Sequence, residues 1–123
     1  MQMLIRIDDG ADTGNAEESV APNPLAGHPA TRVVRKFVHH GGLLNVGTWE
    51  CEPGSFVIPS HPHYEICTIL EGEGSIEQPD GSRMPLAPGT CVFIHKGAHT
   101  TWHVDKRIRK TFLCCAPQEA ADA

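Results

Sequence analysis

From Thr31 onward the chain is a series of short segments rich in β-branched and aromatic residues, and this regularity most constrains its fold. Turn-forming pairs such as Pro53-Gly54, Asp80-Gly81 and Pro88-Gly89 separate many of them. Short strands separated so regularly are typical of an all-β sandwich or barrel, and no segment has a helical hydrophobic period. The expected strands lie in residues 31–39, 43–51, 55–60, 64–73, 74–78, 82–86, 90–95, 100–104 and 108–115.

The first thirty residues differ from the rest of the chain in residue composition. Residues 4–7 can form a short strand, but residues 8–30 are rich in Asp, Glu, Gly, Pro and Ala and offer little to bury. We expect an extended, partly mobile arm here, laid over a neighbour. The predicted organisation is therefore an N-terminal strand and arm (1–30) followed by one domain (31–123), because 123 residues are too few for two ordinary domains.

Charge and composition limit the classes of partner and the cellular compartment that we expect. The net charge of −5 argues against nucleic acid as a partner, and the basic run 106–110 (KRIRK) is interpreted as the solvated side of a strand. The five scattered cysteines indicate reduced core thiols rather than a disulfide framework. Neither a signal-peptide segment nor a membrane-spanning run is evident, which favours the cytoplasm and no membrane partner.

Two of the expected strands are apolar on both faces, namely residues 91–94 (CVFI) and 112–115 (FLCC). One face can line a barrel interior, while the other must pack against a second sheet or a partner subunit. A homodimer is therefore expected, because an isolated small barrel would expose a large apolar patch.

The chain from Gly47 onward resembles the cupins. The stretches that carry the resemblance are GTWECEPGSF (47–56), YEICTILEGEG (64–74), LAPGTCVFIHKG (86–97) and TTWHV (100–104). Their order is similar to that of the small single-domain cupins of the ureidoglycine aminohydrolase type, many of unknown function. The resemblance implies an RmlC-like fold, a double-stranded β-helix or jelly-roll barrel.

The resemblance also implies a ligand set for a divalent metal such as Mn, Fe, Ni or Zn. His61, Glu65 and Gly72 match the first cupin motif, but Pro59 and Thr100 stand where two of the usual ligands would be. One interpretation is a mononuclear metal site on His61 and Glu65, completed by His63 or His99. The alternative is that these polar groups ring the barrel mouth, hydrogen-bonded and free of metal.

Glu65 shares a strand face with Cys67 and Ile69, which the resemblance places inside the barrel. A buried carboxyl has a raised pKa and can act as a general base, unless a cation or hydrogen-bond donors meet it and make it structural. Cys67 is either a nucleophile activated by a histidine or an inert buried thiol. Trp102 is expected to fill the barrel or to wall its pocket.

Three functions follow from these residues. The first is metal-assisted hydrolysis of a small amine- or ureido-bearing acid, with Glu65 or a bound water moving the proton. The second is metal-free binding of a small polar molecule through His61, His63 and Thr100, beside Cys67 and Trp102. The third is a structural or regulatory dimer. We favour a small-molecule-binding cupin.

Overall fold

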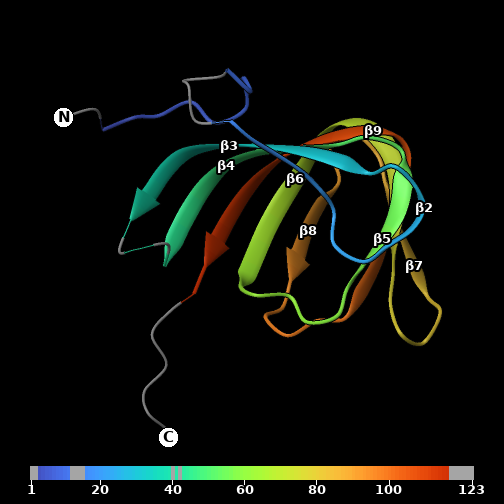
Figure 1. Ribbon diagram of the computed structural model, residues 1–123. Helices are drawn as coiled ribbons and strands as arrows, with labels where there is room; N and C mark the ends of the chain where they lie inside the picture. The colour runs from blue at the N-terminus through green and yellow to red at the C-terminus, as the bar shows by residue number, and fades with distance from the viewer. Residues whose placement is uncertain (1–2, 12–15, 40, 42, 117–123) are drawn as a thin grey trace, which may run out of the picture.

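The computed structural model describes residues 3–11, 16–39, 41 and 43–116, which form one strongly curled antiparallel sheet (Figure 1). Its pairing order is β1-β3-β4-β9-β5-β2, and β6 pairs with β7, β8 and β9. No helix in the described part of the chain is long and apolar enough to cross a membrane. The strands are β1 Glu17–Val20, β2 Pro24–Gly27, β3 Ala30–His39, β4 Leu44–Cys51, β5 Gly54–Ile58, β6 Tyr64–Glu77, β7 Arg83–Leu86, β8 Cys91–Ile94 and β9 Thr100–Cys115. The predicted all-β cupin fold is confirmed.

Two long strands replace four expected short ones. Segments 64–73 and 74–78 are continuous in β6, and 100–104 and 108–115 are continuous in β9. The two strands pair along most of their length, with register shifts between Ile69 and Gly74. Gly72 has a φ of 99°, and a side chain there would meet the backbone carbonyl of Arg107. Glycine therefore bends these strands together here instead of ending them.

The turn predicted at Asp80-Gly81 is present. It joins β6 to β7, with Glu77 opposite Arg83, and Gly81 has a φ of 88°. The Asp80 carboxylate accepts hydrogen bonds from the backbone N–H and the hydroxyl of Ser82, at 2.9 and 2.6 Å. Glycine supplies the positive φ and aspartate closes the turn locally, as the pair of residues predicts.

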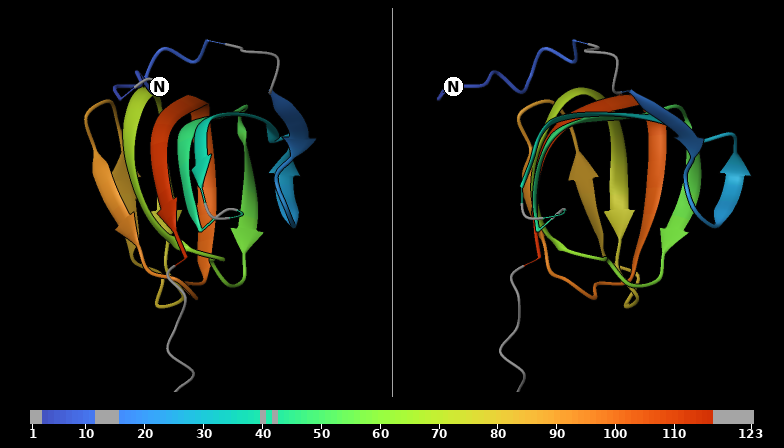
Figure 2. Two further views of the ribbon diagram at one scale, coloured as in Figure 1. Left: turned by 90° about the vertical axis from the view of Figure 1, so that its left-hand side faces the viewer. Right: turned by 60° about the vertical axis from the view of Figure 1, so that its left-hand side comes forward.

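Part of the N-terminal segment belongs to the same sheet. Residues 4–7 form no strand, but β1 pairs with β3 and β2 pairs with β5. Figure 2 shows these two strands at the open side of the curled sheet. Ala21 at 4% and Pro29 below 2% exposure are packed like core residues. The sheet therefore includes residues that precede Thr31.

The core fills the inside of the curl. Alternate residues of β6 (Glu65, Cys67 and Ile69) are buried there, as expected. From β9 the buried set is Thr100, Trp102, Val104, Ile108, Lys110, Phe112 and Cys114. A lysine thus occupies an inward position of the central strand, between isoleucine and phenylalanine. The expectation that the charged residues of the run 106–110 face solvent is wrong at Lys110.

Candidate functional site

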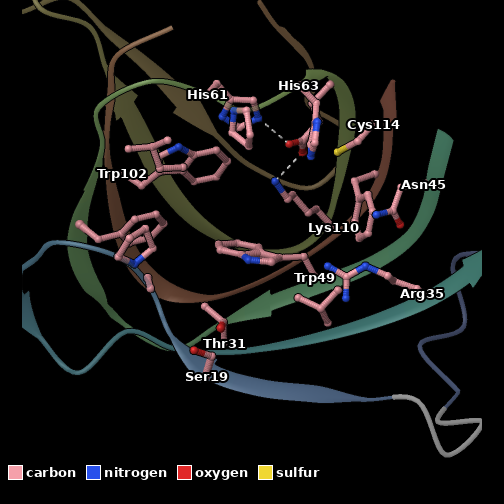
Figure 3. A pocket seen from close by; sticks show the side chains of 18 of the residues that line it. Ser19, Thr31, Arg35, Asn45, Trp49, His61, His63, Trp102, Lys110 and Cys114 are labelled. Atoms are coloured by element: carbon pink, nitrogen blue, oxygen red, sulfur yellow. Dashed lines mark hydrogen bonds and ion pairs between the residues drawn. The ribbon is translucent and has the colours of Figure 1, made fainter. Parts of the chain in front are cut away.

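One side of the barrel interior is a cavity of about 410 Å³ (Figure 3). Its apolar wall includes Val33, Trp49, Phe56, Trp102 and Phe112, and its polar wall includes Arg35, Asn45, His61, His63, Glu65 and Lys110. Residues 19–22, in and after β1, close another side. The N-terminal segment therefore contributes directly to the cavity, which the sequence alone did not indicate.

A buried ionic triad lies on the cavity wall. Glu65 accepts a hydrogen bond from His61 Nε2 on Oε1 at 2.8 Å and one from Lys110 Nζ on Oε2 at 2.7 Å. The three residues are 5–6% exposed. Strand alternation brings Glu65 and Lys110 to the inside, and the loop before β6 carries His61 to them. The predicted juxtaposition of His61 and Glu65 is therefore present in the structure, with a lysine added.

The Lys110 ammonium group is also enclosed by aromatic rings. Its Nζ lies 4.6 Å from the ring centroid of Trp49 and 4.7 Å from that of Trp102. Taking an ammonium group out of water costs several kcal/mol, and the Glu65 carboxylate and the two ring faces offset that cost. This arrangement explains how a charged lysine is stable inside the barrel.

These contacts determine the protonation of the triad. Burial alone would raise the pKa of the Glu65 carboxyl, but the charge of Lys110 and the His61 hydrogen bond lower it well below its usual range. Burial would likewise lower the pKa of Lys110, yet Glu65 raises it above its ordinary value. Glu65 is therefore ionised and Lys110 is charged at neutral pH. A cation and a donor meet this carboxylate, which is the condition under which we expect a structural group rather than a general base.

An ionised Glu65 can only accept hydrogen bonds, so the proton of a neutral His61 is on Nε2. His61 Nδ1 is buried and has no hydrogen-bond partner among the described residues. The same holds for His63 Nδ1, Trp102 Nε1 and Asn45 Oδ1. Burying one such group without a partner costs about 1–3 kcal/mol. Five residues that line one cavity thus have a buried polar atom without a hydrogen bond, and four of these atoms also lack an ion pair, the exception being Arg35 Nη1 beside Glu17.

The other predicted site residues lie elsewhere. His99 is exposed and does not line the cavity, and Thr100 is buried at the start of β9, also outside the lining. Cys67 is buried, and burial raises the pKa of its thiol to about 11, so it is protonated and unsuited to nucleophilic attack at neutral pH. The structure brings together His61, His63, Glu65 and Trp102, and it does not bring His99, Thr100 or Cys67 to the cavity.

The donor set does not fit a divalent metal. Both carboxylate oxygens of Glu65 are engaged, and one of them by a cation at 2.7 Å, so a metal would have to displace the Lys110 ammonium. Within the described residues no group of three or more His, Cys, Asp or Glu side chains is arranged to hold a metal ion. The side chains of the triad therefore favour an ion pair over a metal centre.

Comparison with known proteins agrees with this architecture. Residues 38–112 match the family model of the EutQ-like cupin domain. The chain belongs to this family. The match supports a cupin domain, and the finer assignment to the ureidoglycine aminohydrolase type stays a prediction. No curated protein matches this EutQ-like cupin.

Solved structures resemble the EutQ-like cupin in fold. A protein of unknown function from Pseudomonas syringae pv. tomato has a TM-score of 0.72 and 22% identity, over 80% of this chain and 43% of that one. The EutQ protein of Clostridium difficile has a TM-score of 0.62 and 20% identity, over 71% and 63%. Ectoine synthase from P. lautus has a TM-score of 0.70 and 17% identity, over 95% and 80%. The chain thus spans less than two thirds of the first two proteins, and these identities show the fold alone.

Proposed function

We propose that this cupin binds a small organic molecule inside its barrel without a metal ion. The observation that carries the proposal is the cavity of about 410 Å³ whose lining residues hold four buried, unpaired polar atoms. Ligand pockets in proteins measure ~300–1,000 Å³ and combine apolar walls with a few polar groups. Buried polar atoms in folded proteins are paired with protein groups or with water, so a ligand that displaces water from the cavity can take over these hydrogen bonds.

The triad supports binding without metal. Glu65 and Lys110 neutralise each other, so the triad presents no free carboxylate to a metal ion. Glu65 also holds His61 with Nδ1 free, so this nitrogen can accept a hydrogen bond from a ligand or take a proton from it. Acid–base catalysis is the second candidate function, and the observation that favours it is this unpaired His61 Nδ1. In that case His61 would be the general base, and Glu65 would orient it.

Intrinsic fluorescence gives a direct binding assay, because both tryptophans of the chain line the cavity. A screen of small metabolites should identify compounds that change this fluorescence and raise the unfolding temperature. Val33→Phe should fill the cavity and abolish both effects. The matched control is Val57→Phe, on β5 between the inward residues Phe56 and Ile58, and it should bind normally. Equal responses of the two variants would contradict binding in the barrel.

Metal analysis tests the remaining part of the proposal. Protein purified without chelator or added metal should contain Mn, Fe, Ni and Zn well below one ion per subunit. A stoichiometric metal that His61→Ala removes and His28→Ala retains would overturn the metal-free site. His28 is the control because it is exposed and does not line the cavity.

We also propose that the protein is a homodimer. One row of apolar side chains crosses the outer face of five paired strands, with Phe93 opposite Ile66, Ile66 opposite Leu113, Leu113 opposite Val46, and Val46 opposite Phe37. Phe93 is 62% exposed and Ile66 is 46% exposed. Monomeric proteins seldom expose a continuous apolar surface of this kind, so a second copy is the simplest cover.

A further inference from the structure

We propose that the ligand is a small carboxylate, with its acid group on Arg35 and an aromatic or planar apolar body against the tryptophan side of the cavity. The inference rests on the proposed binding function and adds the chemical class of the ligand. The charges along the cavity wall, and the partners of those charges, support it.

The charges that line the cavity do not balance. Among the described lining residues, Arg35, Glu65 and Lys110 carry formal charge. Glu65 and Lys110 are in direct contact at 2.7 Å and cancel. Arg35 therefore remains as a positive charge at the cavity, in a protein whose net charge is −5. A local positive charge of this kind favours an anionic ligand.

The present partner of Arg35 is one that a ligand can replace. Arg35 Nη1 contacts Glu17 Oε1 at 2.6 Å, but the Glu17 side chain is 66% exposed and is on the short edge strand β1. Glu17 does not line the cavity, whereas Arg35 does. Ion pairs with an exposed partner contribute little, because water competes for both groups. A ligand carboxylate inside the cavity can form two parallel hydrogen bonds to the guanidinium group, which is the stronger arrangement.

The shape of the cavity sets the rest of the molecule. Figure 3 shows Arg35 and Asn45 together at one end, Trp102 at the other, and Lys110 and Trp49 between them. The Asn45 amide lies beside Arg35, and its NH2 group can donate a hydrogen bond to the same carboxylate, whereas its unpaired Oδ1 needs a donor elsewhere on the ligand. Phe56 and Trp102 stack with their planes 11° apart and their centroids separated by 6.0 Å, so the far wall is aromatic. A carboxylate attached to a flat apolar body matches both ends.

Benzoate and its neutral isostere benzamide test the inference, with isothermal titration calorimetry as the measurement. Benzoate should bind at least about tenfold more tightly than benzamide, because a charged hydrogen-bonded pair is lost in the amide. Arg35→Gln should remove this preference, and Arg35→Lys should retain part of it. Thermal unfolding of each variant shows that the fold is intact.

Glu17 provides a test of opposite sign. Glu17→Gln frees Arg35, so benzoate affinity should rise about two- to fivefold. Glu18→Gln makes the same charge change one residue along β1, opposite Arg32, and should have a smaller effect. The carboxylate assignment would be overturned if benzamide bound as tightly as benzoate, or if Arg35→Gln left benzoate binding unchanged. Either result would leave the proposed binding function standing. No binding of either probe at millimolar concentration would also overturn the carboxylate assignment, and the metabolite screen would then judge the binding function by itself.

Discussion

The substitution Lys110→Met should destabilise the protein strongly at neutral pH. Methionine matches the lysine stem in length and apolar character, so the change removes the ammonium group and leaves little empty space. Glu65 would then be an ionised carboxylate at 5% exposure, with His61 as its remaining contact. The cost comes from an unpaired buried charge rather than from lost packing.

The magnitude follows from the contacts of Lys110. Removing one member of a buried ion pair costs about 3–5 kcal/mol, and here two tryptophan ring contacts are lost as well. For a chain of this size, such a loss corresponds to a decrease in the unfolding midpoint of roughly 10–20 °C. Urea unfolding monitored by tryptophan fluorescence measures the free energy directly.

The loss should also depend on pH. In the natural protein the folded-state pKa of Glu65 is lowered, so its ionised form adds stability above its unfolded pKa, and this stability is lost as pH falls through the folded-state value. Without Lys110, burial raises the pKa of Glu65, and the folded state then binds the proton more tightly than the unfolded chain does. The difference between the two proteins should therefore be largest near pH 7 and should shrink toward pH 5.

The control for this experiment is Lys106→Met. Lys106 is on the same strand as Lys110 and contacts Glu73 of β6 at 2.9 Å. Both side chains are more than half exposed. We expect almost no change in its unfolding midpoint. A Lys110→Met protein within about 1 kcal/mol of the natural one at neutral pH, with no pH dependence, would refute the assignment of Lys110 as the essential partner of Glu65.

Three further predictions concern other parts of the fold. Among the thiols, exposed Cys91 should react first with a disulfide reagent at pH 8. Burial raises the pKa of Cys67 to about 11 and that of Cys114 to about 12, so these two should react only after unfolding. Fast reaction of all three thiols would contradict the burial of Cys67 and Cys114. Light scattering should find a dimer that Phe93→Glu converts to a monomer and that Met84→Glu, on β7 outside the apolar row, leaves intact; a monomeric natural protein would end the dimer proposal. Gly72→Ala should lower the free energy of unfolding by more than about 1 kcal/mol, and clearly more than Gly81→Ala does. Both glycines have a positive φ, but only a side chain at position 72 would meet backbone atoms. Equal losses in the two variants would mean that φ alone explains the effect.

The strand pattern and the cupin motifs predicted the fold well. Alternation in β6 correctly placed Glu65, Cys67 and Ile69 on one face, and the cupin resemblance correctly turned that face inward. The resemblance also matched His61 and Glu65, which are in contact. In the prediction β6 was divided because glycine in a sequence signals a turn, and β9 was divided because Asp105 was interpreted as a turn residue. Whether Gly72 ends a strand or bends it depends on the partner strand, which local sequence does not specify.

Lys110 is one of the cavity residues that the sequence interpretation missed, together with Arg35 and Asn45. Arg107 and Arg109 lie near Lys110 in the sequence, and their charges led us to expect all the charged residues of 106–110 to face solvent. The signal was nevertheless present, since Lys110 has the same strand parity as Ile108, Phe112 and Cys114, all of which are buried. The interpretation gave charge more weight than alternation. The structure shows that Glu65 and the rings of Trp49 and Trp102 stabilise the buried lysine.

The segment from Ser19 to Pro22 closes one side of the cavity, and together with Arg35 it precedes residue 38, where the match to the family begins. In the proposed site, some of the residues that would contact the ligand therefore lie outside the stretch that matches the family. Relatives could exchange a short N-terminal stretch and acquire a new substrate while the common scaffold stayed unaltered. Ligand preference in such proteins would then diverge faster than their barrels, and grafting this stretch between relatives would be the economical way to redirect them.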